Sequence, residues 1–271
     1  MHLSVMKVAR PVFKTVLVEG NIASGKTACL QYFEKLFGDQ VETLAEPVNK
    51  WRDVRGHNTL DLMYANPSRW SLTFQTYVQL TMLDAHVQTT DKPVKMMERS
   101  IHSAKHCFVE NLHRSGFMPD VEHTVLSEWF EWIKANLTVN ADLIVYLQTK
   151  PEVCRQRLLR RCRPEELKVS LSYLQSLHDL HESWLIRQEF GPTPPIMVID
   201  ANDDMECMQV KYGERASLIL DHHFSVLEQE KSKTNNKKEV EFFFSSSSSS
   251  SVCPEAAAGN GSKTEKANAT G

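Results

Sequence analysis

The residues Val18–Leu30, VEGNIASGKTACL, carry the strongest structural signal in this chain. Within it, GNIASGKT fits the pattern GxxxxGK[ST] of a phosphate-binding loop. The apolar run at residues 13–18 precedes this loop and the helix-competent ACLQYFEKLF follows it, which is the strand–loop–helix context that the pattern requires. We therefore expect the loop to bind the phosphates of a nucleoside triphosphate.

The residue types in the loop predict what each part contributes. Backbone amides around Ala23–Lys26 would point into a concavity at a helix N-terminus, where aligned dipoles favour anions. Lys26 would add a positive charge at the β- and γ-phosphates, and the Thr27 hydroxyl would ligate Mg²⁺. The predicted nucleotide-binding residues of the loop are Gly20, Asn21, Ile22, Ala23, Ser24, Gly25, Lys26 and Thr27.

Apolar runs recur along the chain with long helix-like stretches between them. They lie at residues 13–18, 41–44, 94–97, 141–147 and 196–199. Residues 70–87 and 172–186 carry apolar side chains at spacings of three and four, as amphipathic helices do. This alternation predicts an α/β fold with a five-stranded parallel sheet covered by helices on both faces.

Composition divides the chain into one domain and two flanking segments. We predict a flexible N-terminus over residues 1–11, a single domain over 12–227 and a disordered tail over 228–271. The tail contains seven consecutive serines and few apolar residues, so it cannot bury enough surface to offset the entropy of ordering.

Charge and hydropathy argue against several kinds of partner. The net charge of −3 does not suit a duplex-binding surface, so no nucleic-acid partner is expected. No apolar run approaches the roughly 18 residues of a membrane span, and no membrane partner is expected. The six cysteines form no CxxC pair, which indicates a reducing compartment. We expect a soluble, cytoplasmic protein.

Two basic segments leave other compartments open. The first 15 residues carry three cations and no acid, a faint mitochondrial-presequence character. The tail segment KSKTNNKK leaves nuclear import as a second alternative, although a solvated tail is the preferred interpretation.

Acidic residues follow two of the predicted strands at the end where open α/β sheets bind ligands. Glu46 follows the second strand and is our candidate general base, which would accept the proton of an attacking hydroxyl. Glu98 and Arg99 follow the third strand, where Glu98 could hold Mg²⁺ through water and Arg99 could stabilise the transferred phosphoryl group. The alternatives are a surface carboxylate at Glu46 and a local ion pair between Glu98 and Arg99.

Five arginines crowd into the stretch VCRQRLLRRCRPEEL: Arg155, Arg157, Arg160, Arg161 and Arg163. Crowded cations repel one another unless they share an anion, so we predict a mobile lid that closes on the phosphates. A solvated helix face is the alternative. The neighbouring Glu165 and Glu166 could cap the cluster or reach a sugar hydroxyl.

An aromatic set lies among these motifs: Trp51, Tyr64, Trp70, Phe74 and Phe108, with Gln75 beside Phe74. Rings that stack on a nucleobase, together with one amide that pairs with its edge, would suit this composition. Core packing is the alternative, and we prefer it for Trp70.

These motifs together resemble the deoxyribonucleoside kinase family. The resemblance rests on VEGNIASGKT, EPVNKWR, MYANPSRWSLTFQTYVQLTML, MERSIHSAKHCFVENL, ADLIVYLQT, RRCRPEE and YLQSLHDLHESWLI, in order from about Val16 to Ile199. It implies a P-loop kinase fold and the transfer of the ATP γ-phosphoryl group to the 5′-hydroxyl of deoxyribonucleosides in nucleotide salvage. Thymidine and deoxycytidine are the expected favoured acceptors, with purines also accepted. A homodimer and inhibition by a deoxynucleoside triphosphate end product are implied by the resemblance alone.

The resemblance also assigns roles residue by residue. Glu46 matches the family's catalytic base, Glu98 and Arg99 match its magnesium and phosphate residues, and Arg161 and Arg163 match its lid arginines. The expected nucleoside contacts are Gln75 at the base edge, Trp51, Phe74 and Phe108 as aromatic walls, Tyr64 and Glu166 at the sugar 3′-hydroxyl, and Val78, Met82 and Ala104 around the base. Pro164 is a departure in the lid that could stiffen its closure.

Two rival functions stay open from the residues alone. A nucleoside monophosphate kinase would need cations in its acceptor pocket. A non-catalytic nucleotide-binding switch is the other rival, although the N-K-x-D motif typical of a GTP switch is missing.

Overall fold

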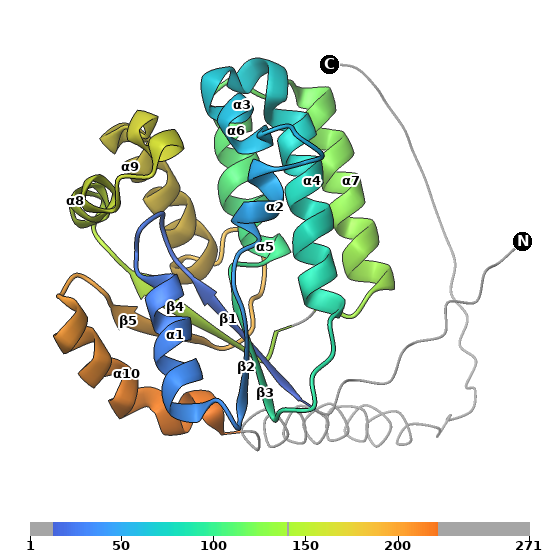
Figure 1. Cartoon of the computed structure of the whole chain (residues 1–271). Coiled ribbons are helices and arrows are strands. Elements are labelled where there is room, and N and C mark those ends of the chain that lie inside the picture. The colour runs from blue at the N-terminus through green and yellow to red at the C-terminus, as the bar shows by residue number, and fades with distance from the viewer. Residues whose placement is uncertain (1–12, 140, 222–271) are drawn as a thin grey trace, which may run out of the picture. The chain divides into compact units, whose positions relative to one another are not determined.

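A computed structural model describes residues 13–139 and 141–221 of the chain. Five parallel strands form its sheet in the order β2-β3-β1-β4-β5 (Figure 1). They are β1 (Lys14–Glu19), β2 (Val41–Leu44), β3 (Val94–Glu98), β4 (Leu143–Gln148) and β5 (Ile196–Asp200). All five predicted strands are confirmed. Every residue of β1 and β3 is buried, which explains why the middle of each strand is apolar.

The two faces of the sheet carry separate cores. Val16 and Val18 pack in one apolar cluster with α1 (Lys26–Phe37) and α10 (Met205–Leu220). Leu17, whose side chain points the opposite way, packs in the other with Leu174 and Leu177 of α9 (Leu171–His181). The predicted cover of helices on both faces is therefore confirmed.

Helix α9 is one of four elements that follow β4 along the chain. The other three are α8 (Pro151–Arg161), the 3-10 helix η2 (Pro164–Lys168) and the π-helical turn η3 (Glu182–Ile186). The predicted helix at residues 172–186 is thus α9 continued by η3. Pro164 occupies the first position of η2, where its missing N–H costs nothing.

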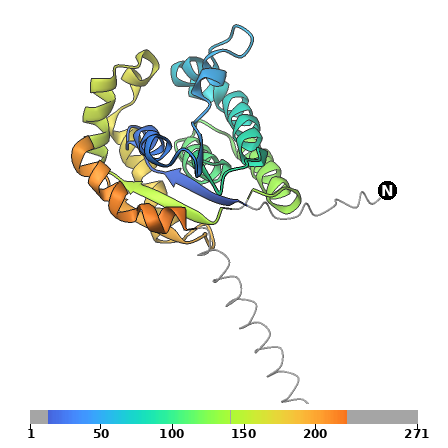
Figure 2. The same cartoon turned by 60° about the horizontal axis from the view of Figure 1, so that its bottom comes forward.

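A third core lies among helices that come between β2 and β4 along the chain. Its elements are α2 (Val48–Arg52), α3 (Thr59–Ala65), α4 (Pro67–Val87), α5 (Ile101–Ser103), the π-helical η1 (Ala104–Val109), α6 (Glu110–Arg114) and α7 (Asp120–Asn136). Phe74, Met82, Ile101 and Phe130 are buried in this core. Figures 1 and 2 both show α4 and α7 on the side of the domain away from α8 and α10.

The predicted helix at residues 70–87 begins three positions earlier than expected, at Pro67. Asn66 caps it by accepting a hydrogen bond from the Arg69 amide, and Pro67 suits the first turn. No helix among the described residues has the length and apolar character needed to cross a membrane. The predicted flexible N-terminus at residues 1–11 and disordered tail at 228–271 lie outside the described residues.

Candidate active site

The loop between β1 and α1 has backbone geometry that only small residues allow. Gly20 and Gly25 have φ of +147° and +101°. A Cβ on Gly20 would lie 2.8 Å from the carbonyl oxygen of Leu147, so any larger residue would clash with β4. Ala23 also has a positive φ, of +61°. The sequence pattern therefore corresponds to a tightly wound loop that opens at the N-terminus of α1.

Two side chains brace this loop from within. Asn21 donates a hydrogen bond to the carbonyl oxygen of Leu174 in α9 (2.8 Å) and accepts one from the Ile22 amide (2.8 Å). The ammonium group of Lys26 donates to the carbonyl oxygen of Asn21 (2.7 Å). Burial lowers the pKa of Lys26 to about 8, and the nearby positive charge of Arg99 adds to the effect. An anion in the loop would raise the pKa of Lys26 again, because it favours the charged form.

Thr27 and Glu98 meet across the gap between α1 and β3. The Thr27 hydroxyl lies 2.9 and 3.0 Å from the two carboxylate oxygens of Glu98. A hydroxyl and a carboxylate are hard oxygen ligands of the kind Mg²⁺ takes, and both residues line the same cavity as Lys26. The donor set therefore fits the predicted magnesium role.

Arg99 pairs with Glu46, not with Glu98. Its Nε lies 2.9 Å from Glu46 Oε1, and its Nη1 donates to the carbonyl oxygen of Gly20 (3.1 Å). The alternative of a local Glu98–Arg99 ion pair is wrong, because β2 and β3 are neighbours and bring Glu46 to Arg99. Burial raises the pKa of Glu46 against the opposing attraction of Arg99. The raised pKa makes the Glu46 carboxylate better suited to accept a proton.

Arg99 has an unusual backbone conformation for its residue type, with φ of +63°. Its guanidinium group lies over the Phe108 ring, 4.6 Å from the ring centre. The next residue, Ser100, caps α5 by accepting hydrogen bonds from the His102 and Ser103 amides. The strained turn therefore places the charge of Arg99 over the cavity and begins a helix directly after it.

Glu19 is a buried carboxylate that the sequence interpretation missed. It ends β1, is fully buried, and its Oε1 accepts a hydrogen bond from the Ser100 hydroxyl (2.6 Å). Its Oε2 has no hydrogen-bond partner among the described residues. Burial raises the pKa of Glu19 to about 7, against the opposing effects of Ser100 and Arg99. The sequence did offer a signal for this residue, because Glu19 is the acid directly before Gly20 of the phosphate loop.

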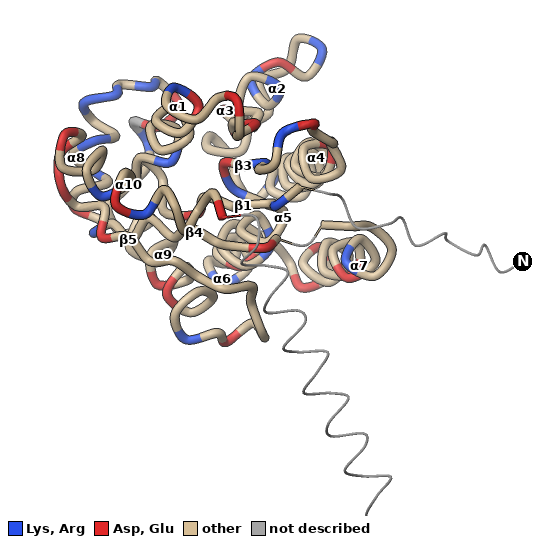
Figure 3. The backbone as a smooth tube through the Cα atoms, turned by 90° about the horizontal axis from the view of Figure 1, so that it is seen from below, with Lys and Arg blue, Asp and Glu red and all other residues tan. Residues whose placement is uncertain are grey.

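The predicted lid follows the C-terminal end of α8, where Cys162 takes a left-handed conformation. Figure 3 shows several blue Lys and Arg segments in the part of the tube around α8. Arg161 and Arg163 both form ion pairs with Glu166. These three residues line the cavity, as predicted. Arg157 does not line it; its guanidinium group donates to the backbone carbonyl oxygens of Ala201 (2.9 Å), Asp203 and Ser24 (3.4 Å). Arg157 therefore contacts the backbone of the phosphate loop, and its predicted role in nucleotide binding stays a prediction.

The lid is joined to the helices on the opposite side of the cavity, which the sequence did not indicate. Arg52 of α2 forms an ion pair with the buried Glu165. Lys168 lies 3.5 Å from Asp61 of α3, but both of those side chains are half exposed. The Arg52–Glu165 pair is therefore the stronger connection.

The other end of the cavity is lined by the predicted aromatic set. The cavity has a volume of about 240 Å³. Trp51 and Phe74 pack edge to face with ring centres 5.7 Å apart, and the Trp51 indole donates to the Thr81 hydroxyl (2.8 Å). Tyr64, Phe74, Gln75, Val78, Met82, Ala104 and Phe108 line the same space. Trp70 does not line the cavity. It packs against the third core, which is the alternative that the sequence analysis preferred.

Gln75 is the one amide of this set. Its side chain is 3% exposed, and its Oε1 has no hydrogen-bond partner among the described residues. An unpaired buried amide oxygen is costly unless a ligand supplies a donor. The arrangement suits the edge of a planar base held between Phe74 and Phe108.

Of the predicted site residues, the cavity brings together Ile22, Ala23, Lys26, Thr27, Glu46, Trp51, Tyr64, Phe74, Gln75, Val78, Met82, Glu98, Arg99, Ala104, Phe108, Arg161, Arg163 and Glu166. The remaining ones, Gly20, Asn21, Ser24, Gly25 and Arg157, shape or brace the phosphate loop from outside the cavity. Phosphate-binding and base-binding groups thus share one space.

Comparisons with known proteins agree on one family. A family model described as deoxynucleoside kinase matches residues 16–222. The Homo sapiens protein thymidine kinase 2, mitochondrial, is 56% identical over 206 residues, which cover 76% of this chain and 77% of that protein. Human deoxycytidine kinase is 34% identical over 223 residues, covering 71% and 85%. Deoxycytidine kinase 2 of Gallus gallus is 33% identical over 228 residues, covering 73% and 86%. The matched span includes the loop, the strand ends and the lid.

Proposed function

This chain belongs to the deoxynucleoside kinase family, and from that membership we propose that its cavity binds ATP with Mg²⁺ and a deoxyribonucleoside whose 5′-hydroxyl receives the γ-phosphoryl group. Membership confirms the resemblance seen in the sequence and makes the chain a deoxynucleoside kinase. Thymidine and deoxycytidine are the proposed favoured acceptors, with purine deoxynucleosides also accepted. Both rival functions lose their support, because neither belongs to this family.

One observation supports this proposal above the others. Glu46 lines the same cavity as Lys26 of the phosphate loop and Gln75 of the predicted base-binding set. A hydroxyl bound next to Glu46 would therefore share one space with a triphosphate on the loop and a base on the amide. Such placement converts a reaction between two substrates into one within a single assembled site.

The residues around Glu46 would divide the chemistry as follows. Glu46 accepts the proton of the 5′-hydroxyl as that oxygen attacks phosphorus. Arg99 stabilises the charge that develops on the transferred group, and Lys26 holds the β- and γ-phosphates. Thr27 and Glu98 would hold Mg²⁺, which supplies charge neutralisation at the phosphates when bound.

The sugar end of the acceptor would be held by Tyr64 and Glu166. Glu166 already pairs with Arg161 and Arg163, so a sugar hydroxyl and the lid would share one carboxylate. Closure of the lid on phosphates would then be sensitive to whether a nucleoside is present. Glu46 near the acceptor hydroxyl disfavours an acceptor that already carries a 5′-phosphate, because like charges repel.

An acceptor panel tests this function. With ATP and Mg²⁺, we expect phosphorylation of thymidine and deoxycytidine, weaker phosphorylation of deoxyadenosine and deoxyguanosine, and none of thymidylate. Uridine measures the requirement for a deoxyribose. Consumption of ATP that is independent of any nucleoside, or transfer to thymidylate in preference to thymidine, would contradict the proposal.

We further propose a homodimer through the outer face of α7. Val121, Val125, Trp129 and Trp132 recur at helical spacing and are 69%, 46%, 55% and 53% exposed. A stripe of this kind on a folded domain marks a binding surface. We expect Trp129→Glu to shift the mass measured by light scattering from dimer to monomer, whereas a wild-type monomer would contradict the proposal.

We also propose feedback inhibition by a deoxynucleoside triphosphate. A deoxynucleoside triphosphate could place its base at Gln75 and its phosphates at Lys26, because both line one cavity. We expect thymidine triphosphate to compete with thymidine in initial-rate kinetics.

The localisation of the protein has two candidates. The sequence favours the cytoplasm, whereas the human relative carries "mitochondrial" in its name. Microscopy of the whole chain with a C-terminal fluorescent tag distinguishes the two compartments.

A further inference from the structure

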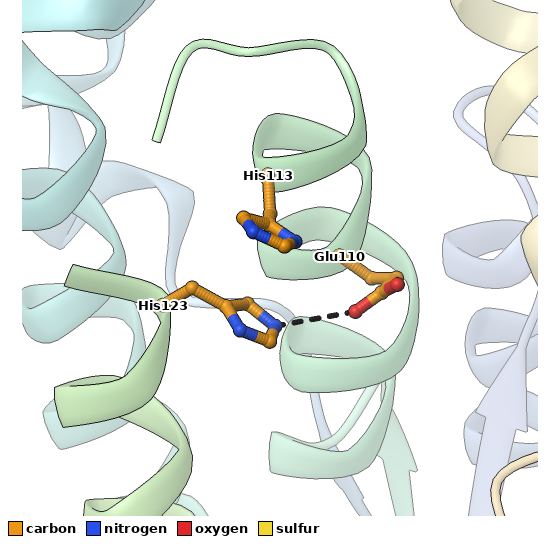
Figure 4. A group of neighbouring side chains, drawn as sticks. All are labelled: Glu110, His113 and His123. Atoms are coloured by element: carbon orange, nitrogen blue, oxygen red, sulfur yellow. Dashed lines mark hydrogen bonds and ion pairs between the residues drawn. The ribbon is translucent and has the colours of Figure 1, made fainter. Parts of the chain in front are cut away.

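A second group of metal-ligand side chains lies away from the cavity. Glu110 and His113 come from α6 and His123 comes from α7, and one ligand atom of each lies within 4.8 Å of the others (Figure 4). None of the three lines the cavity. Their side chains are 15%, 30% and 22% exposed, so the group is shielded but reachable from solvent.

The backbone explains why these side chains converge. Glu110 and His113 are three residues apart and therefore share one face of α6. The short segment after α6 returns the chain as α7, and the His123 ring stacks on the His113 ring with centres 4.1 Å apart and planes at 15°. Ligands around a tetrahedral zinc ion lie about 3.4 Å apart, so small side-chain rotations would bring the three into range.

Neighbouring groups hold two of these side chains in orientations that suit a metal ligand. Arg114 donates to Oε1 of Glu110 (2.6 Å), which leaves Oε2 beside His123. His113 Nε2 lies 2.9 Å from Asp120 Oδ1. With the proton on Nε2, His113 carries its lone pair on Nδ1, as in the carboxylate–histidine–metal arrangements of known sites.

A cation already lies beside one member of the group. The ammonium nitrogen of Lys105 is 2.9 Å from His123 Nε2. An ammonium group can only donate, so this contact requires the lone pair of His123 to be on Nε2, the atom that also faces Glu110. Lys105 is half-buried on a flexible stem and can leave toward solvent. A metal ion bound by the group would compete with Lys105 for the lone pair of His123.

We propose that Glu110, His113 and His123 form a binding site for one Zn²⁺ ion per chain, with Lys105 as its built-in competitor. Two imidazoles and one carboxylate match the preference of zinc, whereas Mg²⁺ prefers oxygen ligands alone. Because the ligands come from two helices, the ion would fasten α6 to α7. This inference does not depend on the proposed function.

Metal binding to the whole chain tests the site. The protein is freed of metal with a chelator, kept in millimolar Mg²⁺ to occupy the phosphate site, and titrated with Zn²⁺ in a calorimeter and with Co²⁺ in a spectrophotometer. We expect one ion per chain, visible Co²⁺ bands typical of a tetrahedral site, and a rise in melting temperature of about 5 °C with the ion in hundredfold excess over its Kd.

Three variants assign the binding to these residues. His113→Ala and His123→Ala should each weaken Zn²⁺ binding at least about tenfold, as loss of one ligand does. His57→Ala, at an exposed histidine outside the group, should leave it unchanged. Lys105→Ala should tighten binding several-fold, an effect that a mere ion-pair cluster would not produce.

Circular dichroism and thymidine kinase activity show that each variant has folded. Equal Zn²⁺ binding by wild type and a His113→Ala/His123→Ala double variant would overturn the proposal, and so would the absence of binding by wild type. Weaker binding by Lys105→Ala would overturn the role of Lys105 as a competitor.

Discussion

Glu46 and Arg99 follow neighbouring strands of the sheet and form an ion pair of 2.9 Å at the wall of the cavity. Arg99 also donates to the carbonyl oxygen of Gly20, so one guanidinium group joins the carboxylate to the phosphate loop. A bound acceptor hydroxyl would lie where this pair meets the nucleotide. The pair therefore couples the proposed base to the charge that stabilises the transferred group.

Glu46→Gln should lower kcat for thymidine by about 10²–10⁴-fold, because the amide keeps the shape of the carboxylate but cannot accept the proton. Nucleoside affinity, measured by calorimetry, should change less than about threefold. Glu42→Gln, on the preceding strand β2 and 36% exposed, is the matched control and should leave kcat unchanged. Near-normal turnover in Glu46→Gln would rule out this residue as the base.

Glu19→Gln should change how stability depends on pH. The folded-state pKa of Glu19, about 7, lies above its ordinary value of 4.5, so the folded protein binds the extra proton more tightly. Its stabilising effect is fully present below pH 4.5 and is lost as the pH rises through 7, a change of up to about 3 kcal/mol.

The difference between wild type and Glu19→Gln isolates this effect. Buried histidines act in the opposite direction, since burial lowers the pKa of His86 and His181 to about 3. Urea unfolding at several pH values should therefore show the two proteins diverging between pH 4.5 and 7. Parallel curves for the two proteins would show that Glu19 does not titrate in that range.

Gln75→Ala should raise the thymidine KM by about 10–100-fold, since the buried amide loses its hydrogen bonds to the base edge. The KM for ATP should stay within about twofold, because Gln75 is on α4 and not in the phosphate loop. Gln79→Ala, one turn further along α4 and outside the cavity, provides the control. Equal effects on both substrates would indicate a collapsed helix and not a lost base contact.

Arg52→Ala and Glu165→Ala should each lower kcat/KM for ATP by about three- to tenfold, by releasing the lid from α2. A double-mutant cycle should show that the two effects are not additive, as expected for residues in direct contact. The exposed pair Lys168 and Asp61 gives the comparison, and its disruption should change kcat/KM by less than about twofold. Additive effects of Arg52→Ala and Glu165→Ala would show that the two residues do not act through their ion pair.

Local patterns predicted the elements of this protein because each depends on neighbouring residues. The phosphate loop, the five strands and the two long amphipathic helices all follow from spacings within about 20 residues. The positions of Glu46 and Glu98 at strand ends were also visible, since parallel strands present their carboxyl ends at one edge. Charge density in the sequence does not reveal which way a helical side chain points, so the contact of Arg157 with the backbone of the phosphate loop was not predictable.

The fold class, the phosphate loop and the candidate base were predictable from local sequence patterns, and the class of reaction was predictable from family resemblance. The folded structure was needed to show that Arg99 pairs with Glu46 and Glu98 with Thr27, that Glu19 is buried and bonded to Ser100, and that Arg52 pairs with Glu165 of the lid. The difference between the two groups is sequence separation. These contacts join residues from 53 to 113 positions apart, and their partners are set by strand order and helix packing, which local spacing does not encode.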